Sequence, residues 1–168
     1  VLVRGPVALA APVGVRLRSV ETTEDLEKAV AEELPRADVL IMAAAPADYR
    51  PSSPSDAKHP RTDGALAIPM EPTADILRAT IAVRKRGSVI VGFALETGDA
   101  IHKARTKLEG KALDLIVVND ALEPGAGFDV DTNRVAILDR EGNARVVPLA
   151  SKREVADTIL DAVEARLG

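Results

Sequence analysis

Cysteine is absent from this chain of 168 residues, and histidine occurs only twice, at His59 and His102. Without cysteine there can be no disulfide framework, no thiolate nucleophile and no cysteine-ligated metal. Two separated histidines make a histidine-rich metal site improbable as well. Any chemistry must therefore use carboxylates, amines, hydroxyls and the backbone.

The sequence also lacks a long apolar run and a signal-peptide pattern, and it carries no excess of basic residues. No stretch approaches the roughly 20 apolar residues that span a bilayer. The net charge of −4 argues against a general nucleic-acid binder, since nothing would offset phosphate repulsion over a wide surface. We expect a protein of the reducing cytoplasm, with no membrane and no nucleic acid among its partners.

The standard phosphate-binding and hydrolase motifs are missing too. There is no GxxxxGK[ST] and no GxGxxG after a strand, because Gly5 and Gly14 have the wrong spacing, and neither GxSxG nor HExxH occurs. A nucleotide-binding fold with this sequence must hold phosphates in another way, or its glycine-rich loop precedes Val1.

Hydrophobic patterning predicts alternating strands and helices. Strands are expected at "VLVR", "GVRLRSV", "DVLIMAAA", "SVIVGFA" and "LDLIVVND", with the last three buried, and a C-terminal hairpin at "RVAILD" and "ARVVPL". Helices are expected after Thr22, over about 73–86, over about 99–113, and after a capping box of Ser151 and Glu154. The fold class is α/β, a three-layer Rossmann-like arrangement with a mostly parallel sheet and an antiparallel hairpin near the C-terminus. We expect one domain over residues 1–168.

Polar groups gather where the buried strands end. "AAAPADYRP" follows one strand, "GFALET" completes the next, and "VVND" completes a third. Ligands of open α/β sheets bind beyond the carboxyl ends of the strands, so these segments should face one crevice. A long Pro- and Ser-rich loop over 46–64 follows the first of them, and a short edge strand at "ALAIPM" follows the loop.

Lysines offer the most plausible phosphate contacts. Lys103, Lys107 and Lys111 are spaced four apart and share one helix face, which is either a solvated surface or a phosphate clamp. Lys58, in "DAKHPR", either solubilises the long loop or closes on an anion as part of a lid.

Other residues allow two interpretations each. Asp48 and the pair Asn119–Asp120 are ligand-binding groups or turn residues, and Phe93 is a core residue or a stacking platform.

Taken together, "AAAPADYRP", "KHPR", "TADIL", "VGFALET", "KLEGKALDLIVVND" and "GFDVDTNRV" resemble the phosphopantothenoylcysteine synthetase (phosphopantothenate–cysteine ligase) family. Their order and spacing match over nearly the whole chain. The resemblance implies a step of coenzyme A biosynthesis. CTP activates 4′-phosphopantothenate to an acyl-cytidylate with release of pyrophosphate, and L-cysteine then displaces CMP to give 4′-phosphopantothenoylcysteine. Mg²⁺ accompanies the triphosphate, so no protein metal site is implied.

The resemblance also implies roles for particular residues. The loop lysine Lys58 would neutralise the phosphates and the transition state. Asp48 would hold the cytosine or ribose side, and Asn119 and Asp120 would lie near the substrate. The other implied nucleotide contacts are Met42, Ala43, Ala44, Ala74, Asp75, Ile76, Leu77, Phe93, Lys107 and Lys111.

The chain departs from the family pattern in three places. Lys58-His59-Pro60-Arg61 stands where "KIKK" is common, and Thr73-Ala74-Asp75-Ile76 where "NPDI" or "TPDI" is common. The family's N-terminal strand, "GGT" turn, "SNRSSGKMG"-like loop and helix are missing. Since that loop supplies an Asn for the acyl-nucleotide intermediate, the chain as it stands is expected to be catalytically incomplete.

The family further implies a homodimer that uses the long loop and "ALAIPM", with the phosphopantothenate pocket at the interface. It also implies an optional fused flavin-dependent decarboxylase, so FMN is expected only where that half is present. Two alternatives remain. One is a non-catalytic nucleotide-binding module of the same fold. The other, weaker one is a short-chain NAD(P) enzyme, which would need a lysine four residues after Tyr49, where Ser53 stands.

Overall fold

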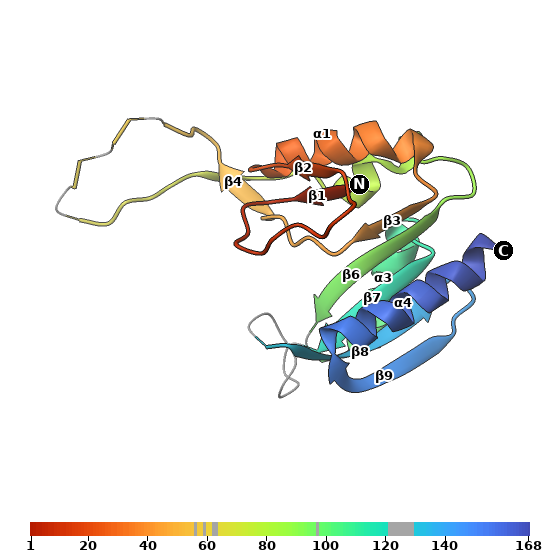
Figure 1. Cartoon of the computed structure of the whole chain (residues 1–168). Helices are drawn as coiled ribbons and strands as arrows, with labels where there is room; N and C mark the ends of the chain where they lie inside the picture. Colours follow the sequence, from red (N-terminus) through yellow and green to blue (C-terminus); the bar gives the residue numbers. More distant parts are fainter. Residues whose placement is uncertain (56, 59, 62–63, 97, 121–129) are drawn as a thin grey trace. The chain divides into compact units, whose positions relative to one another are not determined.

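The computed structural model describes residues 1–55, 57–58, 60–61, 64–96, 98–120 and 130–168. The chain divides into two compact units (Figure 1). The first unit contains residues 1–30 and 45–76, and the second contains residues 31–44 and 77–168. No helix in the described ranges combines the length and the apolarity that crossing a bilayer requires.

The first unit contains two small sheets. Strands β1 (Leu2–Arg4) and β2 (Leu17–Ser19) pair in parallel, and β4 (Tyr49–Pro51) pairs antiparallel with β5 (Met70–Pro72). Helix α1 (Thr23–Glu33) begins in this unit. Thr22 caps it, because its hydroxyl accepts the Asp25 N–H at 3.0 Å and the Asp25 carboxylate accepts the Thr22 N–H at 3.1 Å. This reciprocal cap confirms the predicted helix start.

The second unit is built on a five-stranded sheet in the order β3-β6-β7-β8-β9. Strands β3 (Val39–Met42), β6 (Val89–Glu96) and β7 (Leu115–Asp120) are parallel. Strands β8 (Thr132–Asp139) and β9 (Ala144–Ser151) add antiparallel pairs, which confirms the predicted hairpin and the mixed α/β fold.

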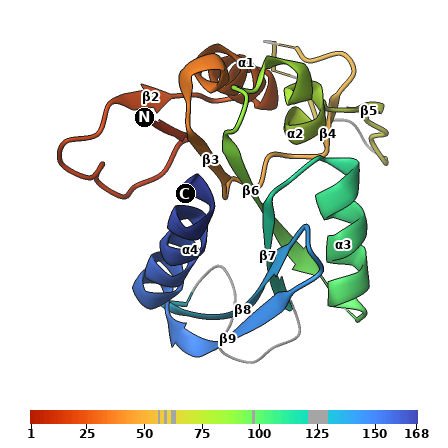
Figure 2. The ribbon, with the colours of Figure 1, turned by 90° about the vertical axis from the view of Figure 1, so that its right-hand side faces the viewer.

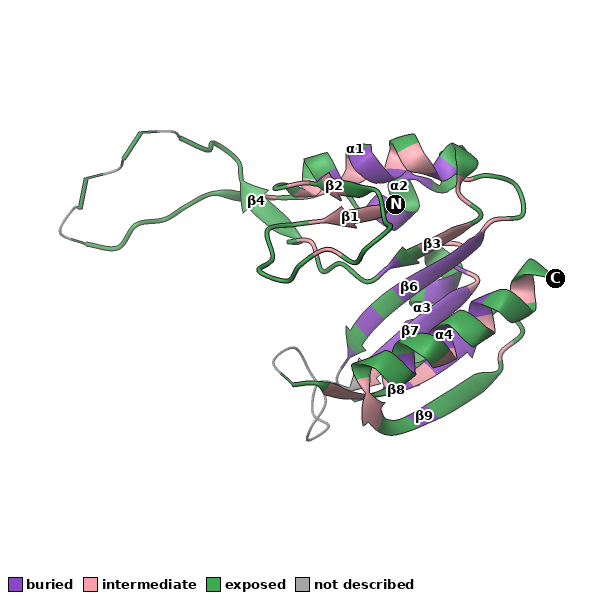
Figure 3. Ribbon diagram, in the orientation of Figure 1, coloured by how far each residue is buried: buried purple, intermediate pink, exposed green. Residues whose placement is uncertain are grey.

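Helices cover both faces of this sheet. Figure 2 shows α3 (Ala100–Gly110) on one face and α4 (Lys152–Leu167) on the other. Val155, Ile159 and Val163 of α4 pack against alternate residues of the strands, and buried residues run along β6 and β7 in Figure 3. The capping box of Ser151 and Glu154 at the start of α4 is present as predicted.

Short helical segments follow α1 and β5. A 3-10 turn, η1 (Leu34–Arg36), follows α1. The expected helix over about 73–86 was wrong in extent, since the structure has only α2 (Ile76–Ala79) and a second 3-10 turn, η2 (Ile81–Val83). Thr80 between them has φ −93° and ψ 3°, which leaves the α-helical region and interrupts the hydrogen-bond ladder.

Three strand predictions need correction. β3 lies at the edge of its sheet, so Ile41 is 39% exposed and the expected burial on both faces was wrong. β4 forms inside the predicted loop 46–64, and the expected strand at "ALAIPM" begins only at Met70. Both shifts arise because β4 and β5 pair with each other, a long-range contact that local patterning does not reveal. Residues 127–129 of "GFDVDTN" lie outside the described ranges.

Candidate functional site

The parallel strands of the second unit end at a common edge. Met42, the last residue of β3, pairs with Gly92, whereas β6 and β7 run on together to the pairs Leu95–Asn119 and Glu96–Asp120. Within this unit the structure therefore brings the predicted strand ends together. Ala43 and Ala44 leave the sheet beside β6, and both are exposed.

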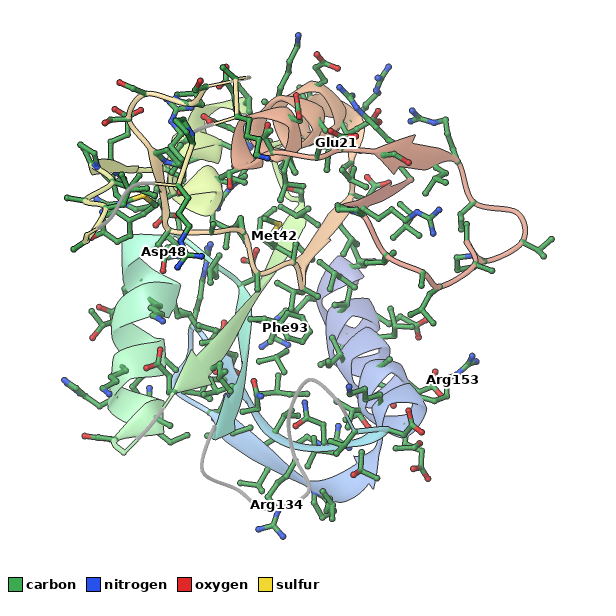
Figure 4. All side chains as sticks on the ribbon, turned by 90° about the vertical axis from the view of Figure 1, so that its left-hand side faces the viewer. Glu21, Met42, Asp48, Phe93, Arg134 and Arg153 are labelled. Carbon is green, nitrogen blue, oxygen red and sulfur yellow. The ribbon has the colours of Figure 1, made fainter. Side chains whose placement is uncertain are left out.

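Phe93 lies on β6 directly after the last residue that pairs with β3. β3 pairs with β6 only as far as Gly92, so no β3 residue lies opposite Phe93. Phe93 is 37% exposed, whereas Gly92 and Ala94, which face the other side of the strand, are buried. Figure 4 labels Phe93 on β6 and Met42 on β3. A partly exposed aromatic ring beyond a strand end can pack on a flat ligand.

Lys103 and Lys107 lie on α3 and both form ion pairs with Glu96, whereas Lys111 is the C-cap residue that follows the helix. Lys107 Nζ lies 2.5 Å from Glu96 Oε1, and Lys103 Nζ lies 3.9 Å from Glu96 Oε2. Glu96 is 9% exposed, whereas the side chains of Lys107 and Lys103 are 43% and 49% exposed. Two lysines of the row therefore contact a buried carboxylate while their side chains stay partly in solvent. The sequence analysis did not single out Glu96, although an acid at the end of a buried strand was a usable signal.

Arg84 joins two of the predicted nucleotide-binding positions. Its Nη2 donates to the backbone carbonyl of Leu77 and, at 3.1 Å, to that of Lys111, and its Nη1 donates to the Ala112 carbonyl at 2.6 Å. Burial lowers the pKa of Arg84 from its ordinary value, with the nearby Arg140 adding to the effect and Asp114 opposing it. No sequence motif pointed to Arg84.

In the first unit, Thr73 brings Asp48 beside the start of "TADIL". The Thr73 N–H donates to the Asp48 carbonyl at 2.9 Å, and the Thr73 hydroxyl donates to the Ala47 carbonyl at 2.6 Å. The Asp48 side chain is exposed, whereas Ile76 is buried. Asp48 and the segment 74–76, which were predicted to contact the nucleotide, are therefore close to each other in this unit.

Lys58 lies exposed in the loop between β4 and β5. Arg50 ties the base of that loop, since its Nε lies 2.9 Å from Glu71 and its Nη1 lies 3.1 Å from Glu24. The hydrogen bond from Arg50 to Glu71, followed by the other interactions with the two carboxylates, raises the pKa of Arg50. His59, the neighbour of Lys58, lies outside the described residues.

A cavity of about 480 Å³ occurs elsewhere in the second unit. It lies at the amino end of β6, and its lining includes Arg84, Ser88, Asp114 and Arg140 but none of the predicted site residues. The described residues contain no cluster of three or more His, Asp or Glu side chains that could hold a metal ion.

Of Asn119 and Asp120, Asn119 is partly buried at the end of β7, and the side chain of Asp120 lies outside the description.

Comparison with known proteins gives consistent matches. Residues 1–167 match the family described as "DNA/pantothenate metabolism flavoprotein C-terminal domain". The chain is 39% identical over 166 residues to the coenzyme A biosynthesis bifunctional protein CoaBC of Bacillus subtilis (strain 168), covering 98% of this chain and 41% of that protein. The chain thus spans less than half the length of this relative.

Solved structures agree with the fold. The crystal structure of the C-terminal domain of a CoaBC protein has a TM-score of 0.79 at 33% identity, covering 98% of this chain and 72% of that one. A Cab2 mutant in complex with phosphopantothenate-cysteine has a TM-score of 0.68 at 19% identity, covering 90% of this chain and 52% of that one. At that identity the second likeness concerns the fold alone.

Proposed function

The chain belongs to the DNA/pantothenate metabolism flavoprotein C-terminal domain family, and on this premise we propose that it is the ligase part of a coenzyme A biosynthesis protein. Its substrates are 4′-phosphopantothenate, CTP and L-cysteine. Relatives that are named coenzyme A biosynthesis bifunctional protein, among them that of Bacillus subtilis, support the assignment.

The proposed reaction has two steps. The carboxylate of 4′-phosphopantothenate attacks the α-phosphorus of CTP, forming an acyl-cytidylate and releasing pyrophosphate. The amine of L-cysteine then attacks the acyl carbon, an amide bond forms, and CMP leaves with the electron pair of the broken acyl–oxygen bond. Both steps bring anions together, so positive charge and positioning matter more than an acid–base pair.

The residues supply those requirements. Lys107 of α3 and Lys111 at the C-terminal cap of that helix bind the triphosphate, and Lys58 of the exposed loop neutralises the phosphates and the transition state. Phe93 packs on the base, and Asp48 contacts the cytosine or ribose side. Small side chains at Ala43 and Ala44 let the nucleotide approach the backbone after β3. The remaining proposed contacts are Met42, Ala74, Asp75, Ile76 and Leu77 for the nucleotide, and Asn119 and Asp120 for the substrate.

The proposed cofactor and partners follow from the same assignment. Mg²⁺ is carried by the triphosphate oxygens, since the side chains proposed to contact the phosphates are the ammonium groups of Lys58, Lys107 and Lys111. The protein acts in the cytoplasm as a homodimer, for which the exposed apolar residues Leu66, Ile68 and Met70 offer surface. FMN belongs to a fused decarboxylase half, where one is present.

The observation that carries the proposal is the common edge of β3, β6 and β7, with a half-exposed lysine row on the adjoining helix. The test is pyrophosphate release by the full-length protein given 4′-phosphopantothenate, L-cysteine and CTP. We expect release that requires both CTP and 4′-phosphopantothenate, and the product mass of the cysteine amide. No release with any nucleoside triphosphate would sink the proposal.

The Lys58→Gln variant separates the ligase from a non-catalytic nucleotide-binding module. We expect kcat to fall steeply because a transition-state charge contact is lost, by about 100-fold or more. Arg153→Gln, an exposed cation on α4, serves as the control. If CTP bound to wild-type protein and Lys58→Gln alike with no turnover in either, the module interpretation would be favoured.

A further inference from the structure

Glu96 occupies an unusual position for an acid. It is the last residue of β6, it is 9% exposed, and it lies on the face of the strand that packs against α3. The alternate residues on that face are apolar, as shown by Ile90 and Ala94. A carboxylate at such a place weakens the fold unless it is paired, because its hydration is lost on burial.

The contacts of Glu96 are divided between two lysines. Oε1 lies 2.5 Å from Lys107 Nζ, and Oε2 lies 3.9 Å from Lys103 Nζ. Oε1 is nevertheless buried without a hydrogen bond of good geometry among the described residues. Oε1 is thus paired with the charge of Lys107 rather than held by a well-aligned hydrogen bond.

The two lysines are much more exposed than Glu96, the carboxylate that they contact. The carboxylate is enclosed, whereas the Lys107 side chain stays 43% exposed and can still reach an anion. Two ammonium groups four residues apart also repel each other, and a carboxylate between them reduces that repulsion. An enclosed acid therefore anchors a lysine whose ammonium group remains available.

We propose that Glu96 is a positioning residue, which holds the Lys107 ammonium group at the strand edge so that it meets the phosphates of a nucleoside triphosphate in one orientation. This inference rests on the proposed function and adds a residue to it. Glu96 does not touch the nucleotide itself. It acts through Lys107 and competes weakly with the phosphates for the same ammonium group.

Glu96→Gln should lower kcat without raising the KM for CTP. Steady-state kinetics of the full-length protein should show kcat reduced about 10- to 100-fold, the usual loss for a misplaced group. The KM for CTP should be unchanged or lower, because the competing negative charge is gone. A purely structural role would change the amount of folded protein and leave both constants as in wild type.

A double-mutant cycle with Lys107→Gln tests whether Glu96 affects kcat through Lys107. In the Lys107→Gln background, Glu96→Gln should produce no further loss of kcat. Glu96→Asp, which keeps the charge but shortens the side chain, should lose kcat as Glu96→Gln does. Asp157→Asn removes the acid of an exposed ion pair with Arg153 on α4 and is the matched control. An undiminished kcat in Glu96→Gln, or a loss that persists without Lys107, would overturn the inference.

A binding measurement separates this inference from the proposed function, because it needs no turnover. Calorimetry with inorganic tripolyphosphate should show about two- to fivefold tighter binding to Glu96→Gln than to wild type. That gain should vanish in the Lys107→Gln background. If wild type released no pyrophosphate while this binding cycle held, the ligase assignment would fail and the Glu96–Lys107 link would stand. If the gain persisted without Lys107, the link itself would be refuted.

Discussion

Gly92 on β6 lies so close to Leu113 that a Cβ atom added to the glycine would be 2.6 Å from Cδ1 of Leu113. Leu113 is 1% exposed and has little room to move. Gly92→Ala should therefore destabilise the protein by about 1–3 kcal/mol through overpacking, measured by chemical denaturation.

Two further variants check the cause of the Gly92→Ala effect. Leu113→Ala removes the obstructing methyl group, so adding Gly92→Ala to it should produce little extra loss. Gly110→Ala, at the end of α3, meets nothing within 4 Å and should be neutral or stabilising by up to about 1 kcal/mol. An unchanged stability in Gly92→Ala would show that β6 and Leu113 separate more easily than the packing indicates.

Arg84→Gln should weaken the second unit. The variant leaves the carbonyls of Leu77, Lys111 and Ala112 without their charged donor, and we expect a loss of about 2–3 kcal/mol in unfolding free energy. The unfolding free energy of Arg84→Lys should lie between those of wild type and Arg84→Gln. A lysine keeps the charge but lacks the planar fork that reaches several acceptors. Arg36→Gln, whose side chain is 73% exposed, is the control and should change stability by less than about 0.5 kcal/mol.

The cap of α4 predicts a pH dependence. The hydrogen bonds that Ser151 donates to Glu154 at 2.7 and 2.9 Å lower the pKa of Glu154 below its ordinary value of 4.5. A depressed pKa in the folded state means that the stabilisation is complete above the unfolded-state pKa. It is lost as the pH falls through the folded-state pKa.

Glu154→Gln keeps the capping geometry without a titrating group. The stability difference between wild type and Glu154→Gln should therefore shrink as denaturation is measured from about pH 6 down to about pH 3. Ser151→Ala, which removes the hydroxyl hydrogen bond to the carboxylate but keeps the backbone one, should reduce the same pH dependence. A difference that stays constant over this range would contradict the assignment.

Phe93→Ala tests base packing at the strand edge. The ring is 37% exposed, so its removal should affect the fold less than the loss of a buried aromatic would. The KM for CTP should rise about two- to tenfold, the loss expected for an aromatic contact of about 0.5–1.5 kcal/mol. Leu160→Ala, an exposed apolar residue of α4, should leave that KM unchanged. Equal KM values in Phe93→Ala and wild type would place the base elsewhere.

Much of the second unit could be predicted from local patterns. Apolar runs identified β6 and β7, and the Ser151–Glu154 spacing identified the start of α4, because each signal depends on neighbouring residues alone. The broken helix after Ala79 was missed, since the backbone at Thr80 departs from helical geometry without a glycine or proline to announce it. The pairing of β4 with β5 was missed because it joins segments about twenty residues apart.

The candidate site divides in the same way. Lys107 and Phe93 were identified as candidate nucleotide contacts from sequence motifs, and their roles are proposals. Arg84 was not identified from the sequence because it donates hydrogen bonds to three backbone carbonyls, and such acceptors have no sequence signature. Glu96 was read as part of a strand motif, and its buried pairing with Lys107 appears only when β6 and α3 are packed together.

The sequence by itself determined the alternation of strands and helices, the helix caps and the absence of thiol chemistry, because these depend on composition and on neighbours along the chain. Tertiary structure decided which residues are constrained. The edge position of β3 leaves Ile41 partly exposed, and packing of α3 on β6 buries Glu96 beside Lys107. Burial and charge pairing depend on partners distant in sequence, so only the folded chain specifies them.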